Sequence, residues 1–168
     1  MKKTLLAILL ILCLLYSSTV VVFASSATPE VFSSDEASLI ETSSTIEYLE
    51  DGSYLVTTIK ESPTPRGEIY SKRGTKEVTL YNSDDEIQWI YYLYGMFTIE
   101  TGVSVVCTDA YRAYEIFDTS WKEDSHSEWY SGNVAYGQAV FKRKVLFITT
   151  STQNLEGAVT CDAYGVIS

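Results

Sequence analysis

The chain has 168 residues, of which 22 are acidic and 12 are basic, so its formal net charge at pH 7 is −10. An acidic surface repels the phosphates of nucleic acids and of anionic lipids, which makes both poor partners for this protein. The length allows one domain of ordinary size together with a tail.

Residues 1–24 have the pattern of a secretory signal peptide. The positively charged Met1-Lys2-Lys3 precedes an apolar run from Leu5 to Leu12, and Val22-Phe23-Ala24 suits a cleavage site before Ser25. A second cleavage site follows Ala27. We therefore expect a secreted, extracellular protein.

An uncleaved membrane anchor is the alternative interpretation of this segment. Residues 4–23 are long enough to reach across a bilayer, but the polar Ser17-Ser18-Thr19 interrupts the apolar stretch. Cleavage before Ser25 would remove two basic residues and no acidic one, which changes the net charge to −12. No second long apolar run follows, so we expect no membrane span in the mature form.

Two of the three cysteines, Cys107 and Cys161, lie outside the signal sequence. In an exported chain two cysteines most simply form a disulfide. This bridge would close a loop of about 55 residues and stabilise the fold by roughly 4 kcal/mol. The alternatives are two buried free thiols or a redox-active pair, and the second is disfavoured because no Cys-x-x-Cys arrangement is present.

The region after the signal peptide divides into four parts. Residues 25–45 are rich in Ser, Thr and Glu and are expected to form a disordered leader, because they cannot bury enough apolar surface. Residues 46–59 form a predicted β-hairpin around Asp51-Gly52, a strong turn dipeptide. The prolines and charges of residues 60–75 are typical of a linker. Residues 76–168 are expected to form the main domain.

The main domain is predicted to be all-β. Period-two alternation is clearest between Glu86 and Glu100, where Gly95 indicates a bend or bulge. Six to eight short strands separated by turns, with no long amphipathic helix, predict an antiparallel sandwich or a barrel. We favour a β-sandwich of immunoglobulin-like type.

The region from Tyr48 to Ser168 resembles a family of small secreted β-rich proteins of unknown function from Gram-positive, Clostridia-type bacteria. The residues that carry the resemblance are, in chain order, Asp51-Gly52-Ser53-Tyr54-Leu55-Val56-Thr57-Thr58-Ile59, Tyr81-Asn82-Ser83 leading to Trp89, Cys107-Thr108, Ser131-Gly132-Asn133 and Thr160-Cys161-Asp162-Ala163. The resemblance implies export and a β domain, and it assigns no catalytic or binding residue.

No catalytic constellation is evident in the sequence. His126 is the only histidine. No nucleophile motif that would complete a catalytic triad is present, and one histidine with two distant cysteines does not indicate a zinc site. Clustered carboxylates occur at Asp84-Asp85-Glu86 and at Glu123-Asp124 near Asp118. Two carboxylates held together in a cleft would permit glycoside hydrolysis, whereas solvated turns account for them more simply. We expect no metal and no cofactor.

Aromatic residues are the most suggestive feature, with 13 tyrosines in the chain. Tyr92 and Tyr94 face away from the core side of their strand. Together with Tyr81 they are a possible binding platform for a sugar or a protein. The alternative is that these rings pack on other parts of the fold.

The sequence therefore favours a non-catalytic binding or cell-surface interaction module, and not an enzyme. A glycan, a cell-wall component or a protein would be its partner. The alternatives are a small secreted hydrolase that uses the clustered carboxylates and a secreted antibacterial effector.

Overall fold

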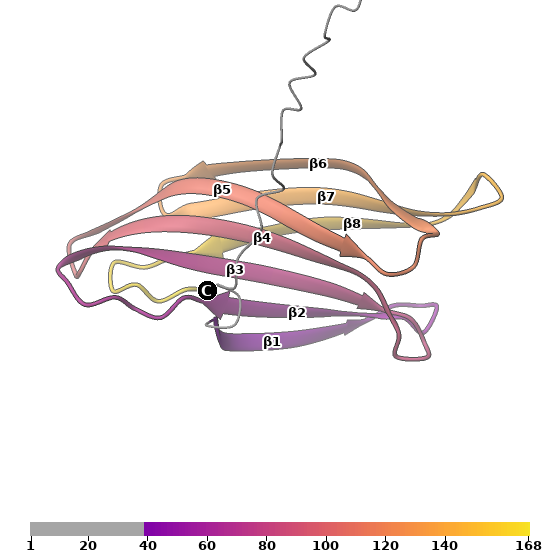
Figure 1. The fold of residues 1–168 in the computed structure, drawn as a ribbon, viewed down its shortest axis with the longest axis horizontal. Coiled ribbons are helices and arrows are strands. Elements are labelled where there is room, and N and C mark those ends of the chain that lie inside the picture. Colours follow the sequence, from indigo (N-terminus) through magenta and orange to yellow (C-terminus); the bar gives the residue numbers. More distant parts are fainter. Residues whose placement is uncertain (1–38) are drawn as a thin grey trace, which may run out of the picture. The chain divides into compact units, whose positions relative to one another are not determined.

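The computed structural model describes residues 39–168. The predicted signal peptide and residues 25–38 of the predicted leader lie outside the described residues. Eight β-strands form two antiparallel sheets (Figure 1), and this arrangement is consistent with the expected all-β sandwich. No helix among the described residues is long and apolar enough to cross a bilayer.

Sheet A contains five strands in the order β1-β2-β3-β4-β5, and sheet B contains three in the order β6-β7-β8. In chain order the strands are β1 (Ile40–Tyr48), β2 (Tyr54–Glu61), β3 (Ile69–Tyr81), β4 (Ile87–Glu100), β5 (Ser104–Ile116), β6 (Trp121–Ser131), β7 (Val134–Val145) and β8 (Ile148–Thr160). Within each sheet the strands pair in sequence order, and β5 and β6 belong to different sheets, whereas an immunoglobulin-like sandwich has Greek-key connections. The expected immunoglobulin-like topology is therefore not found, because short turns connect consecutive strands directly.

Two boundaries differ from the sequence prediction. The strand β1 begins at Ile40, inside the predicted leader, because pairing with β2 supplies hydrogen bonds such as Thr42 Oγ1 to the Ile59 carbonyl (3.1 Å). The strand β3 begins at Ile69, inside the predicted linker, and pairs with β4 along its whole length. In both segments tertiary pairing overrides a composition typical of a loop.

The core lies between β3–β5 of sheet A and the three strands of sheet B. Trp89 of β4 and Phe141 of β7 are fully buried and stack at 4.4 Å between ring centroids. Small residues let the sheets approach: a Cβ on Gly95 would lie 2.9 Å from Ala135 Cβ of β7 and 2.7 Å from the Phe97 ring. Gly95 thus permits close packing, and the predicted irregularity follows it, as a register shift between Met96 and Phe97.

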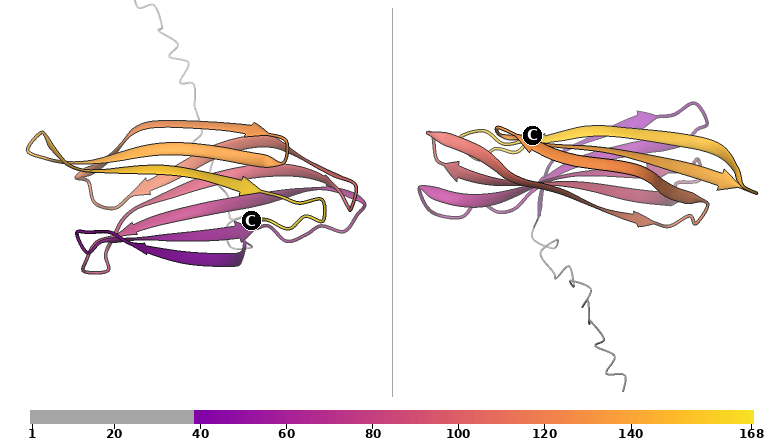
Figure 2. Two further views of the ribbon diagram at one scale, coloured as in Figure 1. Left: turned by 180° about the vertical axis from the view of Figure 1, so that it is seen from behind. Right: turned by 90° about the horizontal axis from the view of Figure 1, so that it is seen from above.

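Sheet B covers only part of sheet A. The strand β8 packs on β3 and β4, while β7 packs on β4 and β5 and β6 packs on β5. Neither β1 nor β2 packs closely against a strand of sheet B, so their inner faces extend past β8 (Figure 2). One region of the inter-sheet space is therefore open beside β8.

The turn between β7 and β8 has an unusual backbone. Leu146 and Phe147 form a two-residue loop with φ angles of 48° and 70°. Turns of this kind strongly prefer Asn-Gly or similar residues, because the left-handed region costs an ordinary side chain on the order of 1 kcal/mol. Two large apolar residues nevertheless occupy these positions.

Candidate functional site: a cavity beside the free edge of β8

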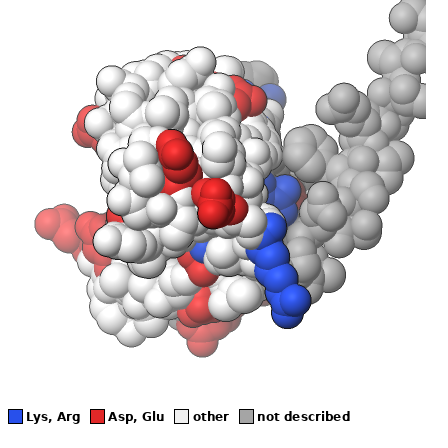
Figure 3. Space-filling model, turned by 90° about the vertical axis from the view of Figure 1, so that its left-hand side faces the viewer, with Lys and Arg blue, Asp and Glu red and all other residues white. Residues whose placement is uncertain are grey.

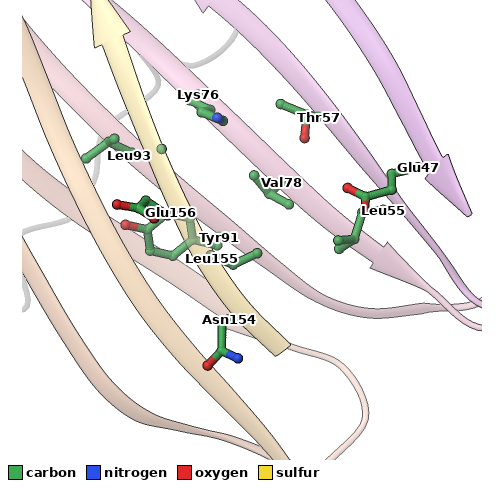
Figure 4. A pocket seen from close by; sticks show the side chains of 11 residues that line it. Glu47, Leu55, Thr57, Lys76, Val78, Tyr91, Leu93, Asn154, Leu155 and Glu156 are labelled. Carbon is green, nitrogen blue, oxygen red and sulfur yellow. The ribbon is translucent and has the colours of Figure 1, made fainter. Parts of the chain in front are cut away.

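A cavity of about 190 Å³ opens between sheet A and β8 (Figure 4). Its walls come from the inner faces of β1–β4 on one side and from four consecutive residues of β8 on the other. Apolar side chains line much of it, and polar groups project into it from several strands. The lining residues are Glu47, Leu55, Thr57, Lys76, Val78, Tyr91, Leu93, Asn154, Leu155, Glu156 and Gly157.

Two lysines lie four residues apart on the inner face of β3, and their surroundings differ. The Lys72 side chain is almost fully buried and its ammonium is well partnered. It lies 3.0 Å from a Glu61 carboxylate oxygen and donates hydrogen bonds to the Gly165 carbonyl (2.7 Å) and to Thr64 Oγ1 (3.1 Å). These contacts satisfy the buried charge, as buried charges generally require.

Lys76 is half-buried in the cavity, and its ammonium has no hydrogen-bond or ion-pair partner within residues 39–168. Its cross-strand neighbours are the apolar Ile59 and Leu93. Burial lowers the pKa of Lys76 from its ordinary value. The carboxylates of Glu47 and Glu156 also line the cavity, but neither forms an ion pair with Lys76. The cavity therefore contains a cation that a ligand anion would stabilise.

The main chain of β8 also borders this cavity. One edge of β8 pairs with β7. Among the described residues the other edge is occupied only at its end, where Thr160 N–H donates to the Ser168 carbonyl (2.8 Å) and Ser168 N–H donates to the Thr160 carbonyl (3.1 Å). Because main-chain groups alternate in direction along a strand, those of Thr152, Asn154, Glu156 and Ala158 point to the same side as Thr160. This stretch is a strand edge without a partner strand among the described residues.

A second polar cluster lies where β5 and β6 meet. Arg112 of β5 is 2.8 Å from a carboxylate oxygen of Glu123 and 3.3 Å from one of Glu128, both on β6. Burial raises the pKa of Glu123, although the charge of Arg112 acts in the opposite direction. Burial also raises the pKa of the Tyr91 hydroxyl, which has no hydrogen-bond partner among the described residues.

This cluster has a structural explanation. The strands β5 and β6 are the edges of their sheets, and inward-pointing charges on edge strands discourage pairing with other chains. Because the guanidinium of Arg112 contacts both carboxylates, Glu123 and Glu128 belong to one ion-pair network.

The structure places the predicted tyrosine platform on the outer face of sheet A, in two groups. Tyr92 and Tyr94 stack on each other at 6.0 Å and are only 7% and 6% exposed. Tyr81 instead stacks on Tyr54 of β2 at 4.9 Å, and Tyr54 lies 5.7 Å from Tyr48 of β1, which is 76% exposed. The cross-strand row of Tyr48, Tyr54 and Tyr81 thus extends the predicted platform toward the sheet edge.

Cys107 and Cys161 are both buried, and both are free thiols in this structure. Cys107 lies on β5 of sheet A, and Cys161 directly follows β8 of sheet B. Their backbone N–H groups donate to the adjacent carbonyls of Gly132 (2.8 Å) and Asn133 (3.2 Å) in the β6–β7 turn. Burial raises the pKa of Cys161 to about 11, and the charge of Cys107 adds to this shift.

The other sequence candidates have local roles. Asp84 and Asp85 are exposed in the β3–β4 turn, where Asp85 accepts a hydrogen bond from the Tyr54 hydroxyl (2.9 Å). Asp124 contacts Lys142 (2.7 Å), whereas Glu123 contacts Arg112, so the neighbouring carboxylates of Glu123 and Asp124 have different partners. The structure does not gather the predicted carboxylates into one site.

His126 lies on the edge strand β6 with its side chain 43% exposed, and its Nδ1 is 3.2 Å from a Glu128 oxygen. No group of three or more potential metal ligands occurs among residues 39–168. On the face shown in Figure 3, acidic side chains are scattered widely and basic ones lie along one side. The acidic surface that the composition predicts is therefore present on this face.

Sequence reasoning missed Lys76 as a site residue, although a signal was present. Lys76 alternates with Val78 and Leu80 and therefore lies on their apolar face. A cation in such a position requires a partner or a ligand. The free edge of β8 carries no signal in the sequence, because it depends on which strands pair.

Comparison with known proteins identifies no relative: no family model, no curated protein and no solved structure matches the chain.

Proposed function

We propose that the protein is an exported, non-catalytic binding module whose ligand is an extended polypeptide segment. The segment adds as an antiparallel strand to the free edge of β8 and places a carboxylate beside Lys76. The observation that carries this proposal is the half-buried ammonium of Lys76, which has no partner within residues 39–168, in a cavity bordered by a strand edge that is unpaired within the same residues.

Strand register defines the side chains that such a segment would need. A Cβ on Gly157 would lie 2.9 Å from Lys76 Nζ, so a ligand side chain opposite Gly157 reaches the ammonium. Directly paired residues of antiparallel strands point to the same face. An acidic residue opposite Gly157 and an apolar one opposite Leu155 therefore match the cavity, which gives the pattern acidic-x-apolar.

Pairing within the chain at the end of this edge supports the proposal. Its last residues turn at Gly165 and pair with the end of β8, with Cys161 and Ile167 as bridge partners. A ligand strand would continue this pairing along Ala158, Glu156 and Asn154. Main-chain hydrogen bonds would provide affinity and the alternate side chains would provide specificity.

Titration of the full chain with short synthetic peptides tests the proposal. The probe is an acetylated, amidated Thr-Glu-Thr-Val-Thr-Thr, in which the glutamate pairs with Gly157 and the valine with Leu155. We expect binding by calorimetry, with at least tenfold weaker affinity (about 1.4 kcal/mol) when lysine replaces the peptide glutamate. The Lys76→Met variant should lose this preference.

N-methylated peptides provide a control that leaves the protein unchanged. Methyl groups on the third and fifth peptide nitrogens block the bonds to Glu156 and Asn154, whereas those on the second and fourth point away from β8. Only the first set should abolish binding. Equal effects of the two sets, or no difference between the glutamate and lysine peptides, would refute strand addition.

The tyrosine row of sheet A supports a second candidate, the binding of a glycan or cell-wall fragment. Tyr48 is exposed and Tyr54 and Tyr81 stack beside it, and exposed tyrosines are typical of recognition surfaces. A glycan and cell-wall array should then show a ligand that Tyr54→Ala loses and that Lys76→Met retains. The absence of such a ligand removes this candidate.

The hydrolase alternative has one observation in its favour, the raised pKa of Glu123 beside a second carboxylate. The guanidinium of Arg112 occupies the place between them, which argues for a structural role. A substrate screen with Glu123→Gln and Glu128→Gln tests the alternative. No turnover, or turnover that both variants retain, excludes it.

A further inference from the structure

The tip of the β7–β8 hairpin is the largest group of consecutive exposed apolar residues in the described part of the chain. Val145, Leu146, Phe147 and Ile148 are 47%, 85%, 100% and 68% exposed. The hairpin extends past the ends of the neighbouring strands in the views of Figures 1 and 2. Contiguous exposed apolar residues of this kind mark contact sites for another molecule or a membrane.

The backbone of the tip provides an independent observation. Leu146 and Phe147 both have positive φ angles, a conformation that Asn-Gly would adopt without strain. Strain at a position that packs against nothing is an indication of function. Neither folding nor packing among the described residues explains two large apolar side chains here.

The charges beside the tip differ from those of the whole protein. Residues 142–155 contain three basic residues, Lys142, Arg143 and Lys144, and no acidic one, in a chain with net charge −10. Lys142 and Arg143 contact Asp124 (2.7 Å) and Asp118 (3.5 Å). Lys144 is exposed and has no such contact among the described residues. The charge of the rest of the protein is screened beyond about 8–10 Å in physiological salt. The local basic groups therefore determine how the tip interacts electrostatically with a nearby surface.

We propose that the β7–β8 tip inserts into the headgroup and upper acyl region of a phospholipid membrane. Leu146 and Phe147 enter the apolar layer, and Lys144 with Arg143 lies near the lipid phosphates, as in peripheral proteins that combine apolar and basic groups. The tip anchors the protein at a bilayer surface and leaves the cavity beside Lys76 accessible. This function is separate from strand addition at β8.

A membrane fits this tip better than a protein partner does. The four exposed residues lie at and beside a two-residue turn, and a small apolar hairpin tip can enter a fluid layer without a matching surface. A stable protein interface needs roughly 800 Å² on each side and a complementary surface. One hairpin tip presents no such area, so a protein pocket is the alternative that the experiment must separate.

Vesicle flotation of the full chain tests the proposal, using phosphatidylcholine alone or with a minor fraction of phosphatidylglycerol. The informative variant is the double substitution Leu146→Asn with Phe147→Gly, because Asn-Gly suits this turn and should raise the thermal midpoint. We expect this variant to bind vesicles at least tenfold more weakly than the wild type. Ile69→Asn, which changes an apolar residue that is 66% exposed elsewhere, should bind as the wild type does.

A local readout separates the tip from the rest of the chain. In Phe147→Trp the additional tryptophan emission should shift to shorter wavelength with vesicles and be quenched by lipids brominated in the upper acyl chain. Lys144→Gln should weaken binding only to vesicles that contain phosphatidylglycerol. Equal flotation of the wild type and the Asn-Gly variant, or an unshifted emission of the tryptophan introduced by Phe147→Trp, overturns the proposal in favour of a protein-binding tip.

Discussion

The two inner-face lysines of β3 show how individual residues reveal a site in this protein. Lys72 is buried with a carboxylate and two hydrogen-bond acceptors, whereas Lys76 is half-buried beside apolar neighbours. Both positions follow from the alternation of one strand. Lys72 finds its partners at the end of β2, in the β2–β3 connection and in the C-terminal loop. Lys76 has no partner among the described residues.

This contrast predicts opposite effects of the same substitution. Lys76→Met should raise the free energy of unfolding of the unliganded protein by about 1 kcal/mol, because a thioether suits the cavity better than an ammonium. Lys72→Met should lower it by about 3 kcal/mol, because Glu61 would lose its cationic partner. Urea denaturation of the two variants measures both changes.

The pH dependence has a defined sign for Lys76. The pKa in the folded state lies below the ordinary value of 10.5, so unfolding takes up a proton in the alkaline range. The destabilising effect of the ammonium is complete below the folded pKa and disappears as the pH rises toward 10.5. The stability difference between Lys76→Met and the wild type should shrink over that range, and a constant difference would contradict this assignment.

Glu123 gives a second pH prediction at the residue scale. Burial raises its pKa above the ordinary value of 4.5, so the folded protein binds the proton more tightly than the unfolded chain. The wild type should therefore gain stability relative to Glu123→Gln as the pH falls toward 4.5 and lose it as the pH rises through the folded pKa. Denaturation midpoints measured across this range test the sign. A wild type that gains stability relative to Glu123→Gln as the pH rises would argue against a buried carboxylate.

At the scale of strands, small residues decide how closely the two sheets pack. Gly95 of β4 faces Ala135 of β7, and a methyl group at Gly95 would lie within 3 Å of Ala135 Cβ and of the Phe97 ring. The Gly95→Ala variant should lower the free energy of unfolding by about 1–3 kcal/mol through overpacking. Thr98→Ala, on the opposite face of the same strand, should change it by at most about 0.5 kcal/mol.

The sequence predicted strand boundaries well where a long alternating pattern was present. The prediction failed where pairing with another strand supplied the stability. The alternating segment from Glu86 to Glu100 corresponds to β4 (Ile87–Glu100) within one residue. The strand β6 has a polar, interrupted sequence, yet it pairs along β7, and its Glu123 and Glu128 form ion pairs with Arg112 of the neighbouring sheet. The polar composition of β6 alone could not predict that Arg112 would lie beside these carboxylates.

At the scale of the whole molecule, the two cysteines lie in different sheets. Cys107 belongs to sheet A and Cys161 follows the last strand of sheet B, so the predicted disulfide would tie the sheets together. We expect non-reduced, exported protein to yield a cross-linked Cys107–Cys161 peptide in proteolytic mass spectrometry. Reduction should lower the free energy of unfolding by roughly 4 kcal/mol. Recovery of both cysteines as alkylatable thiols without reductant would show that export does not bridge them.

Some properties of this protein followed from the sequence alone. Period-two alternation, turn dipeptides and aromatic content were sufficient to predict an all-β fold with two antiparallel layers, because these signals are local. The export signal, the disulfide and the family resemblance stay predictions, and residues 1–38 lie outside the described structure. Export still leads us to expect that Cys107 and Cys161 form a bridge.

Only the tertiary structure decided where the candidate sites lie. The basic cluster at Lys142-Arg143-Lys144 and the apolar residues after it were visible in the sequence, but their position at an exposed hairpin tip was not. The net charge argued against anionic membranes, whereas the fold separates a basic, apolar tip from the acidic remainder. Likewise, Lys76 became a candidate ligand contact only because sheet B is narrower than sheet A and leaves the edge of β8 open. Both outcomes depend on which strands pair and which edges remain free, and these long-range contacts have no local signal in the sequence.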